Sequence, residues 1–493
     1  MTTALGPMCV ATVANKMETW DVEIIDENNY QRYGPKDSNG KPDHETLQKI
    51  RPADVVGLYG GLTSTAPRLY QLAEFYKKLG IITIAGGQHF AGDNISEALN
   101  NHLDFVVIGE GEETIKELLK SIQNEQDACN VKGIAFLKDN KPFLTPSREP
   151  ITDFDKLPAP DFSLVRYAKI RIYPVGWVRG CGMFCEFCTV KGKVRCPAPE
   201  YVFEQITALV EKFNAKYFFM VDDLFGQNRK AALRLCEMLT EYQDATRTRL
   251  DIMVQIRLDK AKDPELLQTM RQARITGVAI GFESPIAEEL EAMNKKIKPE
   301  DMVKLSRIYH KAGFLVHGMF IFGYPMPDGV EFNMSIKERV KRFKQFIRKA
   351  KIDTIQVLLP VPLPGTELTE RLKNSNRIFS KDLIGWEYYD GNFPLFQPDK
   401  PMTPEEIQKA IQKIMGVFYK FKSMFAVGLH VLSFPAMLFF LYNVKKGWRK
   451  WYRPWRNNII RFGGWIILKN WTAEFKKGVF SKKLNQAKKL LKR

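Results

Sequence analysis

The chain has 493 residues, of which 45% are hydrophobic and 26% are charged, and its formal net charge is +18. This size and composition predict two or three ordinary globular domains. The positive charge is concentrated at one end: residues 445–493 hold sixteen Lys and Arg against one acid, Glu474, so the other 444 residues carry only about +3. The first 444 residues are therefore not strongly basic as a whole.

Residues 1–130 alternate between helical and strand patterns, and the first pattern is helical. The expected helices are 7–17 and 69–79, and the expected strands are 21–26, 54–59, 81–85 and 104–108. Strands that alternate with helices predict a parallel, doubly wound sheet. Residues 1–130 are therefore expected to form an N-terminal α/β domain.

Glycine-rich turns follow three of these strands, where sheets of this kind bind ligands. The turn residues are Gly60, Gly61, Thr63 and Ser64; Gly86, Gly87, Gln88 and His89; and Gly109, Glu110 and Gly111. Glycine also ends strands for purely structural reasons, so each turn alone is a weak signal. The three together predict one ligand site at the carboxyl edge of the sheet.

Residues 131–165 are expected to connect two domains, with a small hairpin at 133–137 and 141–144 and a stiff proline-rich crossing at 157–161. Six strand–helix units then follow between residues 170 and 366. Their expected strands are 171–178, 217–221, 251–256, 277–281, 315–322 and 354–359. Six units predict an incomplete (β/α) barrel over about residues 166–370, with active groups at the carboxyl ends of its strands.

The loop after the first barrel strand holds Cys181, Cys185 and Cys188 in the spacing C-x3-C-x2-C, with Phe187 before the last cysteine. Three thiolates on one tight loop can hold three irons of a 4Fe-4S cluster and leave the fourth iron open. A closed zinc site needs a fourth ligand and usually a second knuckle, which this stretch lacks. The remaining cysteines are scattered and indicate a reducing compartment: Cys9, Cys129, Cys196 and Cys236.

Polar residues close the other barrel strands. Asp222 and Asp223 follow the second strand as a metal or acid–base pair, or as an N-cap for the next helix. Gln255 and Arg257 lie on one face of the third strand. Glu283 and Ser284 end the fourth.

The cluster loop resembles that of the radical S-adenosylmethionine (SAM) enzymes, and the glycine turns resemble the cobalamin-binding domain of one large class of them. That class includes the hopanoid methylases and the anaerobic magnesium-protoporphyrin ester cyclase. The resemblance implies that the open iron chelates SAM and that Asp222 or Asp223, Gln255, Arg257, Glu283 and Ser284 contact it. It also implies that the glycine turns contact cobalamin.

Two features depart from that pattern. The D-x-H-x-x-G motif, whose histidine ligates cobalt in many cobalamin proteins, is absent, and we expect His89 to pack near the corrin or a domain interface instead. The chain also opens on a helix, so the first strand of the domain is expected to be missing, leaving a gap between neighbouring strands.

By resemblance, an electron from a ferredoxin- or flavodoxin-type donor cleaves SAM to a 5′-deoxyadenosyl radical, which abstracts hydrogen from an unactivated carbon. Cobalamin would then supply a methyl group. The leading hypothesis is a cobalamin-dependent radical SAM C-methyltransferase. The alternatives are a radical cyclisation or rearrangement enzyme of the same class and a sensor that binds corrinoid or cluster without turnover.

Residues 371–493 are expected to form a helical, basic extension. Residues 424–444 carry no formal charge and are long enough to span a bilayer, but His430 and Pro435 favour a kinked segment lying in the cytoplasmic leaflet. Five tryptophans then alternate with Lys and Arg: Trp448, Trp451, Trp455, Trp465 and Trp471. This pattern favours a cytoplasmic enzyme held at the membrane surface and a lipid substrate over nucleic-acid binding.

Overall fold

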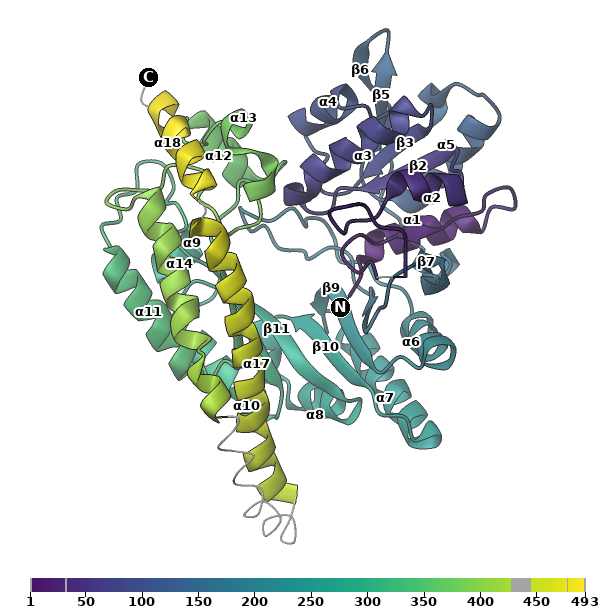
Figure 1. Ribbon diagram of the computed structural model, residues 1–493. Coiled ribbons are helices and arrows are strands. Elements are labelled where there is room, and N and C mark those ends of the chain that lie inside the picture. The colour runs from purple at the N-terminus through teal and green to yellow at the C-terminus, as the bar shows by residue number, and fades with distance from the viewer. Residues whose placement is uncertain (1, 32, 427–444, 477, 492–493) are drawn as a thin grey trace.

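The computed structural model describes residues 2–31, 33–426, 445–476 and 478–491. Two sheets built mainly from parallel strands lie one after the other along the chain, and a set of helices completes the C-terminal side (Figure 1). The N-terminal sheet and its helices lie above one end of the second sheet in this view.

The N-terminal sheet has the strand order β2-β3-β4-β5-β6. Its strands are β2 (Val55–Tyr59), β3 (Ile82–Gly86), β4 (Phe105–Val107), β5 (Ile134–Lys138) and β6 (Lys141–Leu144). The first three are parallel. Helices cover both faces, because one apolar cluster joins the sheet to α3 (Ala66–Lys78) and α4 (Asp93–Asn100). A second cluster joins it to α1 (Leu5–Asn15) and α5 (Gly111–Gln123). The predicted doubly wound sheet is confirmed.

Three details differ from the sequence prediction. The strand expected at 21–26 is only β1 (Ile24–Ile25), and it pairs with β7 (Val165–Arg166) outside the sheet. The five strands of the sheet are paired continuously, without the expected gap. The hairpin β5–β6 is antiparallel and extends the N-terminal sheet instead of standing between domains. Ile134 and Ala135 of β5 are fully buried, so pairing with β4 removes their apolar side chains from water.

The second sheet has six parallel strands in unbroken chain order, which is the incomplete barrel predicted from the sequence. Its strands are β8 (Ile172–Val175), β9 (Tyr217–Phe225), β10 (Asp251–Ile256), β11 (Ile275–Glu283), β12 (Leu315–Ile321) and β13 (Thr354–Leu358). The intervening helices are α6 (Pro199–Phe213), α7 (Arg229–Thr246), α8 (Pro264–Gln272), α9 (Ala287–Ala292), α10 (Pro299–Lys311) and α11 (Ile336–Lys349). Their buried faces form the largest core of the protein.

The C-terminal extension packs against the barrel and also reaches the N-terminal sheet. Its helices are α12 (Glu367–Asn374), α13 (Lys381–Ile384), α14 (Pro404–Phe418), α17 (Lys445–Lys476) and α18 (Val479–Leu491). The long helix α17 runs beside α14, and α14 packs on α11 (Figure 1). Across the described ranges, no helix combines the length and apolarity needed to cross a membrane. The apolar run predicted at 424–444 falls outside those ranges from residue 427 onward.

Candidate active site

The cysteine loop leaves the carboxyl end of β8 and returns to α6. It is closed at its base by paired backbone hydrogen bonds between Arg179 and Arg195, each 2.9 Å long. A third bond, from Gly182 N to Gly192 O at 3.1 Å, closes it further. Gly180 sits at a φ of +81°, and a Cβ there would overlap the carbonyl oxygen of Lys193. Only glycine fits that position, so the sequence itself imposes the tight loop.

The three predicted ligands lie together on this loop and are half-buried. A backbone hydrogen bond from Cys188 N to Cys185 O (3.1 Å) joins two of them. The charges near the Cys185 thiol are those of Lys295, Cys188, Glu283 and Cys181. Burial raises the pKa of Cys185 and so favours its protonated thiol, and binding to iron would require this proton to be lost. Among the described residues no three His, Cys, Asp or Glu side chains already meet the geometry of a bound ion. Three soft donors from one loop nevertheless fit an iron–sulfur cluster.

Two of the other cysteines are poor candidates for ligands. Burial raises the pKa of Cys9 and of Cys236 to about 12, and both lie outside the loop. A metal ligand must be deprotonated, and these thiols are held strongly in the protonated form. The expectation that they do not bind the cluster rests on this burial as well as on spacing.

A polar anchor that the sequence analysis missed holds the middle of the loop. The Glu186 carboxylate accepts hydrogen bonds from Arg371 Nε at 2.5 Å, from Arg371 Nη2 at 2.9 Å and from the Tyr324 hydroxyl at 2.6 Å. The Phe187 ring meets Tyr324 edge-on, with ring centroids 6.1 Å apart. The loop is thus fixed to the end of β12 and to helix α12. In the sequence, the only sign of this anchor was the acidic residue Glu186 between Cys185 and Cys188.

Asp222 supports the start of the cysteine loop. Its side chain is 2% exposed, and Oδ1 accepts hydrogen bonds from the backbone N–H groups of Trp177 (2.5 Å) and Val178 (2.9 Å). The N-cap of the following helix, α7, is Asn228, whose side chain accepts a hydrogen bond from Ala231 N, so the N-cap alternative is wrong. The side chain of Asp223 lies outside the described part of the structure.

Of the predicted SAM contacts on the third and fourth strands, Arg257 lies at the cysteine loop, whereas Ser284 points into the core. Arg257 lies directly after β10, with Nη1 3.3 Å from the sulfur of Met183 in the loop, and Gln255 is half-buried beside it. Glu283 accepts a 2.6 Å bond from Lys295. Ser284 is fully buried, and its hydroxyl bonds to the buried Glu289. The structure therefore uses the Ser284 hydroxyl to support a core network and does not present it to the loop.

The first two glycine turns of the N-terminal sheet touch each other. Gly60 N donates to Gly86 O (2.8 Å), and His89 N donates to Gly60 O (2.9 Å). Gly87 has a φ of +126°, and a Cβ there would lie 2.6 Å from the carbonyl carbon of Gly60. Gly61 and Ser64 flank the buried Thr63 at the start of the following short helix. Close approach of the two backbones therefore requires glycine at Gly87.

His89 is completely buried and has partners on both ring nitrogens. Nε2 lies 3.2 Å from the Tyr70 hydroxyl, Nδ1 lies 3.4 Å from Asn94 Nδ2, and the ring meets Trp386 edge-on. Burial lowers the pKa of His89 to about 4, so the imidazole is neutral at physiological pH. The structure places His89 at the contact between the N-terminal sheet and the C-terminal extension.

His89 would therefore not serve as a ligand to a cobalamin held by this domain. The electron paramagnetic resonance spectrum of bound cob(II)alamin should lack nitrogen splitting from a histidine, because both His89 nitrogens are already engaged. His89→Ala should leave the spectrum unchanged. Splitting that disappears in this variant would contradict the expectation.

The third glycine turn contacts the base of the cysteine loop. Glu110 pairs with Arg195 at 2.8 Å and with Arg179 at 3.3 Å, and Glu112, which is 4% exposed, pairs with Arg179. Glu110 was predicted to contact cobalamin, but its carboxylate is used in these ion pairs. Gln88 accepts a 3.1 Å hydrogen bond from Thr189, beside the last cysteine. The structure thus brings two glycine turns and the cysteine loop together.

We expect Glu112→Gln to loosen this junction. The change leaves Arg179 without its buried carboxylate, and a lost hydrogen bond to a charged group costs about 1.5–3 kcal/mol. The reconstituted cluster should then bleach faster in air, while Glu113→Gln, on the same helix turn but paired with Lys116, should not change the rate. Equal bleaching rates in both variants would contradict a role for this contact.

Comparison with known proteins agrees with this geometry. The family model for the B12 binding domain matches residues 2–119, and that for the Radical SAM superfamily matches residues 176–338. An uncharacterized methyltransferase of Pyrococcus horikoshii is 27% identical, with 84% of this chain and 87% of that protein covered. The hopanoid C-2 methylase of Rhodopseudomonas palustris is 30% identical over 49% of this chain and 44% of that protein.

A solved structure shares the whole arrangement. The cobalamin-dependent SAM radical enzyme OxsB superposes with a TM-score of 0.64 at 15% identity, covering 99% of this chain and 81% of that chain. At this identity the likeness shows the fold.

The two matched domains define a radical SAM enzyme with an N-terminal B12-binding domain. The chain belongs to the cobalamin-binding-domain radical SAM enzymes, the class that contains cobalamin-dependent methyltransferases. Its cofactors are a 4Fe-4S cluster, SAM and cobalamin. Because the chain belongs to this class, it is an enzyme, and the alternative of a sensor without turnover is wrong.

Proposed function

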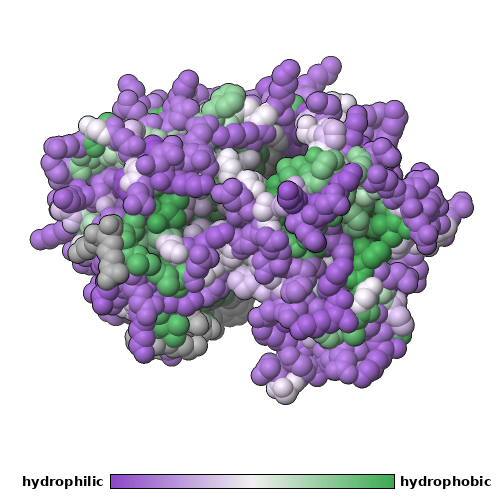
Figure 2. Space-filling model, turned by 90° about the horizontal axis from the view of Figure 1, so that it is seen from above, coloured by the Kyte–Doolittle hydropathy of each residue, from purple (hydrophilic) through white to green (hydrophobic). Residues whose placement is uncertain are grey.

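We propose that this protein is a C-methyltransferase that acts on an unactivated carbon of a lipid. The observation that carries the proposal is the junction of the cysteine loop with the glycine turns, where Thr189 bonds to Gln88 and Arg179 to Glu112. A methyl donor and a hydrogen-abstracting centre must face one substrate carbon, and this junction brings their binding segments together. Seen from above, the surface is hollowed between the N-terminal half and the C-terminal half (Figure 2).

The residues of this chain supply positions and charges. Cys181, Cys185 and Cys188 would hold the cluster, while Arg257 and the Glu283–Lys295 pair would border the SAM side. When bound, the cofactors supply one-electron cleavage of SAM and a transferable methyl group. The protein aligns the substrate carbon between them and excludes water, and a ferredoxin- or flavodoxin-type donor provides the electron.

Two observations support a lipid substrate and a position at the membrane surface. The hopanoid C-2 methylase is among the relatives of this chain, and the name of that protein describes a lipid substrate. Large apolar side chains are also exposed near the C-terminal helices, beside a net charge of +15 in residues 445–493: Phe421, Phe425, Ile459, Ile466 and Ile467. Apolar side chains next to cations favour binding to an anionic bilayer surface.

The test is anaerobic turnover with reduced, reconstituted protein. SAM should be cleaved to 5′-deoxyadenosine, and the lipid extract of a producing strain should contain a species one CH2 heavier than in a deletion strain. Cleavage of SAM with a new ring and no added carbon would instead favour the cyclisation alternative. Flotation with anionic liposomes should be lost when residues 424–493 are removed. Equal flotation of both forms would contradict a membrane role for the extension.

A further inference from the structure

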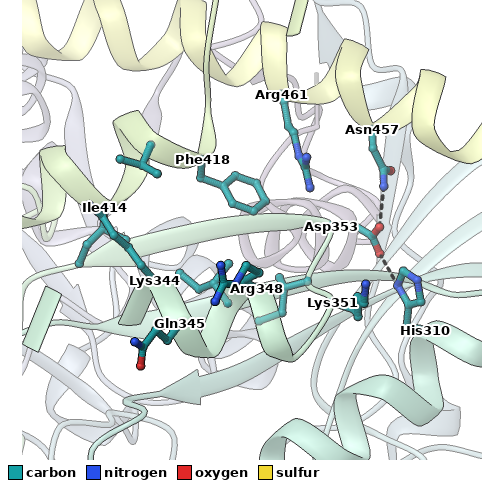
Figure 3. A pocket seen from close by; sticks show the side chains of 13 residues that line it. His310, Lys344, Gln345, Arg348, Lys351, Asp353, Ile414, Phe418, Asn457 and Arg461 are labelled. Atoms are coloured by element: carbon teal, nitrogen blue, oxygen red, sulfur yellow. Dashed lines mark hydrogen bonds and ion pairs between the residues drawn. The ribbon is translucent and has the colours of Figure 1, made fainter. Parts of the chain in front are cut away.

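A basic cavity of about 590 Å³ lies at the end of the barrel opposite the cysteine loop. Asp353 on its wall directly precedes β13, whereas the cysteine loop follows the carboxyl end of β8, and the barrel strands are parallel. Side chains from α11, α14 and α17 point into the cavity, with Arg461 reaching down from α17 (Figure 3). The proposed chemistry of methyl transfer does not use this cavity.

Cations dominate the lining. Lys344, Arg348, Lys351 and Arg461 face the cavity, and in the described ranges none of them forms an ion pair with a carboxylate. The one acid, Asp353, is 2% exposed and already accepts hydrogen bonds from Val316 N (2.9 Å) and Asn457 Nδ2 (2.7 Å). It also lies 3.7 Å from His310 Nδ1. The cavity therefore has an excess of positive charge that its own acid does not balance.

Arg461 is positioned in the cavity with a hydrogen-bond donor that a ligand can use. Its guanidinium lies over the Phe418 ring, 4.6 Å from the ring centroid, and its buried Nε lacks a hydrogen-bond acceptor among the described residues. Burial lowers the pKa of Arg461, and burial with the nearby Lys413 and Lys420 lowers the pKa of Lys344. A bound anion would relieve both costs. Arg348 has a simpler role, because it lies in the last turn of α11, where a cation complements the helix dipole. That explanation does not extend to Arg461 or Lys344.

We propose that this cavity binds a phosphate group, with Lys344 and Arg461 as its cationic contacts and Phe418 beside the attached apolar part. Arg forms paired hydrogen bonds to phosphate oxygens, and Lys supplies a point charge. The phosphate could come from a lipid headgroup or from a soluble phosphate ester. Exposed apolar side chains at Val417, Phe421 and Phe425 continue from the cavity wall, which places an anionic lipid headgroup within reach of both kinds of contact.

The test compares the full-length protein with two double variants that each remove two charges. Lys344→Gln/Arg461→Gln removes the proposed contacts, whereas Lys341→Gln/Lys349→Gln removes two lysines of α11 that are exposed and do not line the cavity. Glycerol 3-phosphate at matched ionic strength should raise the melting temperature of the wild type and of the α11 control by about 2–4 °C, and leave the cavity variant unchanged.

Vesicles distinguish the source of the phosphate. Loss of two surface charges weakens binding to anionic vesicles about thirtyfold. If a lipid headgroup occupies the cavity, the cavity variant should lose clearly more affinity for phosphatidylglycerol vesicles than the control, and if only the soluble ester does, the two losses should be equal. Either result with its matching melting shift supports the proposal.

The proposal is overturned if the cavity variant matches the control in both assays. Circular dichroism and the melting temperature in chloride verify that each variant folds, and Arg461→Lys, which keeps the charge but removes the forked donor, provides a milder change. Cleavage of SAM should be the same in all these proteins, so failure of the cavity proposal and failure of the proposed methyl transfer are measured separately.

Discussion

Replacing Cys181, Cys185 and Cys188 together by alanine should abolish the iron–sulfur centre and all cleavage of SAM. The three thiols lie on one glycine-closed loop, and no other described cysteine lies on that loop to substitute for them. After anaerobic reconstitution, the iron content should fall from about four per chain to near zero, with loss of the brown colour. Iron analysis and the yield of 5′-deoxyadenosine measure the two effects.

Cys196→Ala is the matched control for this experiment. Cys196 is also half-buried and lies just beyond the base of the loop, next to Arg195, but outside the C-x3-C-x2-C spacing. The control should retain its iron and its activity. Retention of about four irons by the triple variant, or loss of iron by Cys196→Ala, would show that the ligand assignment is wrong.

Local sequence patterns were sufficient for the strands and for the cysteine loop. The barrel strands appear as apolar runs, and their parallel order follows from the helices between them. The strand expected at 171–178 placed the cysteine loop at the carboxyl end of the first barrel strand, as the structure shows for β8. These features depend on neighbours in the sequence, so the sequence alone contains them.

The orientation of polar side chains at strand ends was not predictable in the same way. Asp222 and Ser284 were both expected just after barrel strands, yet Asp222 lies within β9 and holds the backbone of Trp177, and Ser284 bonds to Glu289 in the core. The pairing register shifts near both positions, between β9 and β10 and between β11 and β12. A shift of one residue turns a side chain to the other face of a sheet, and sequence periodicity does not reveal it.

Contacts between distant parts of the chain were also missed. Trp386 and Lys381 of the extension donate hydrogen bonds to Glu97 of helix α4 in the N-terminal domain, and Trp386 packs on His89. Arg371, from the same extension, anchors Glu186 in the cysteine loop. The extension therefore connects the two cofactor-binding parts. This role depends on tertiary packing between residues that are far apart in the sequence.

Gly87→Ala should strongly weaken cobalamin binding. The residue has a φ of +126°, which is costly for any side chain by about 1–3 kcal/mol, and its new Cβ would lie 2.6 Å from Gly60 C and 2.8 Å from Gly61 N. Backbone atoms cannot move aside as a flexible side chain can, so the turns after β2 and β3 must separate. If these turns hold cobalamin, the dissociation constant for hydroxocobalamin, measured by absorbance titration, should rise at least about tenfold.

Two other glycines of the same domain separate the contribution of the clash from that of backbone strain. Gly80 also has a positive φ, +76°, but a Cβ there would meet no atom within 4 Å. Gly80→Ala should therefore lower the melting temperature through strain while keeping cobalamin affinity. Gly57 has neither a positive φ nor a close neighbour, and Gly57→Ala should change neither property. Unchanged cobalamin affinity in a folded Gly87→Ala protein would show that the contact between these two turns does not form the cobalamin site.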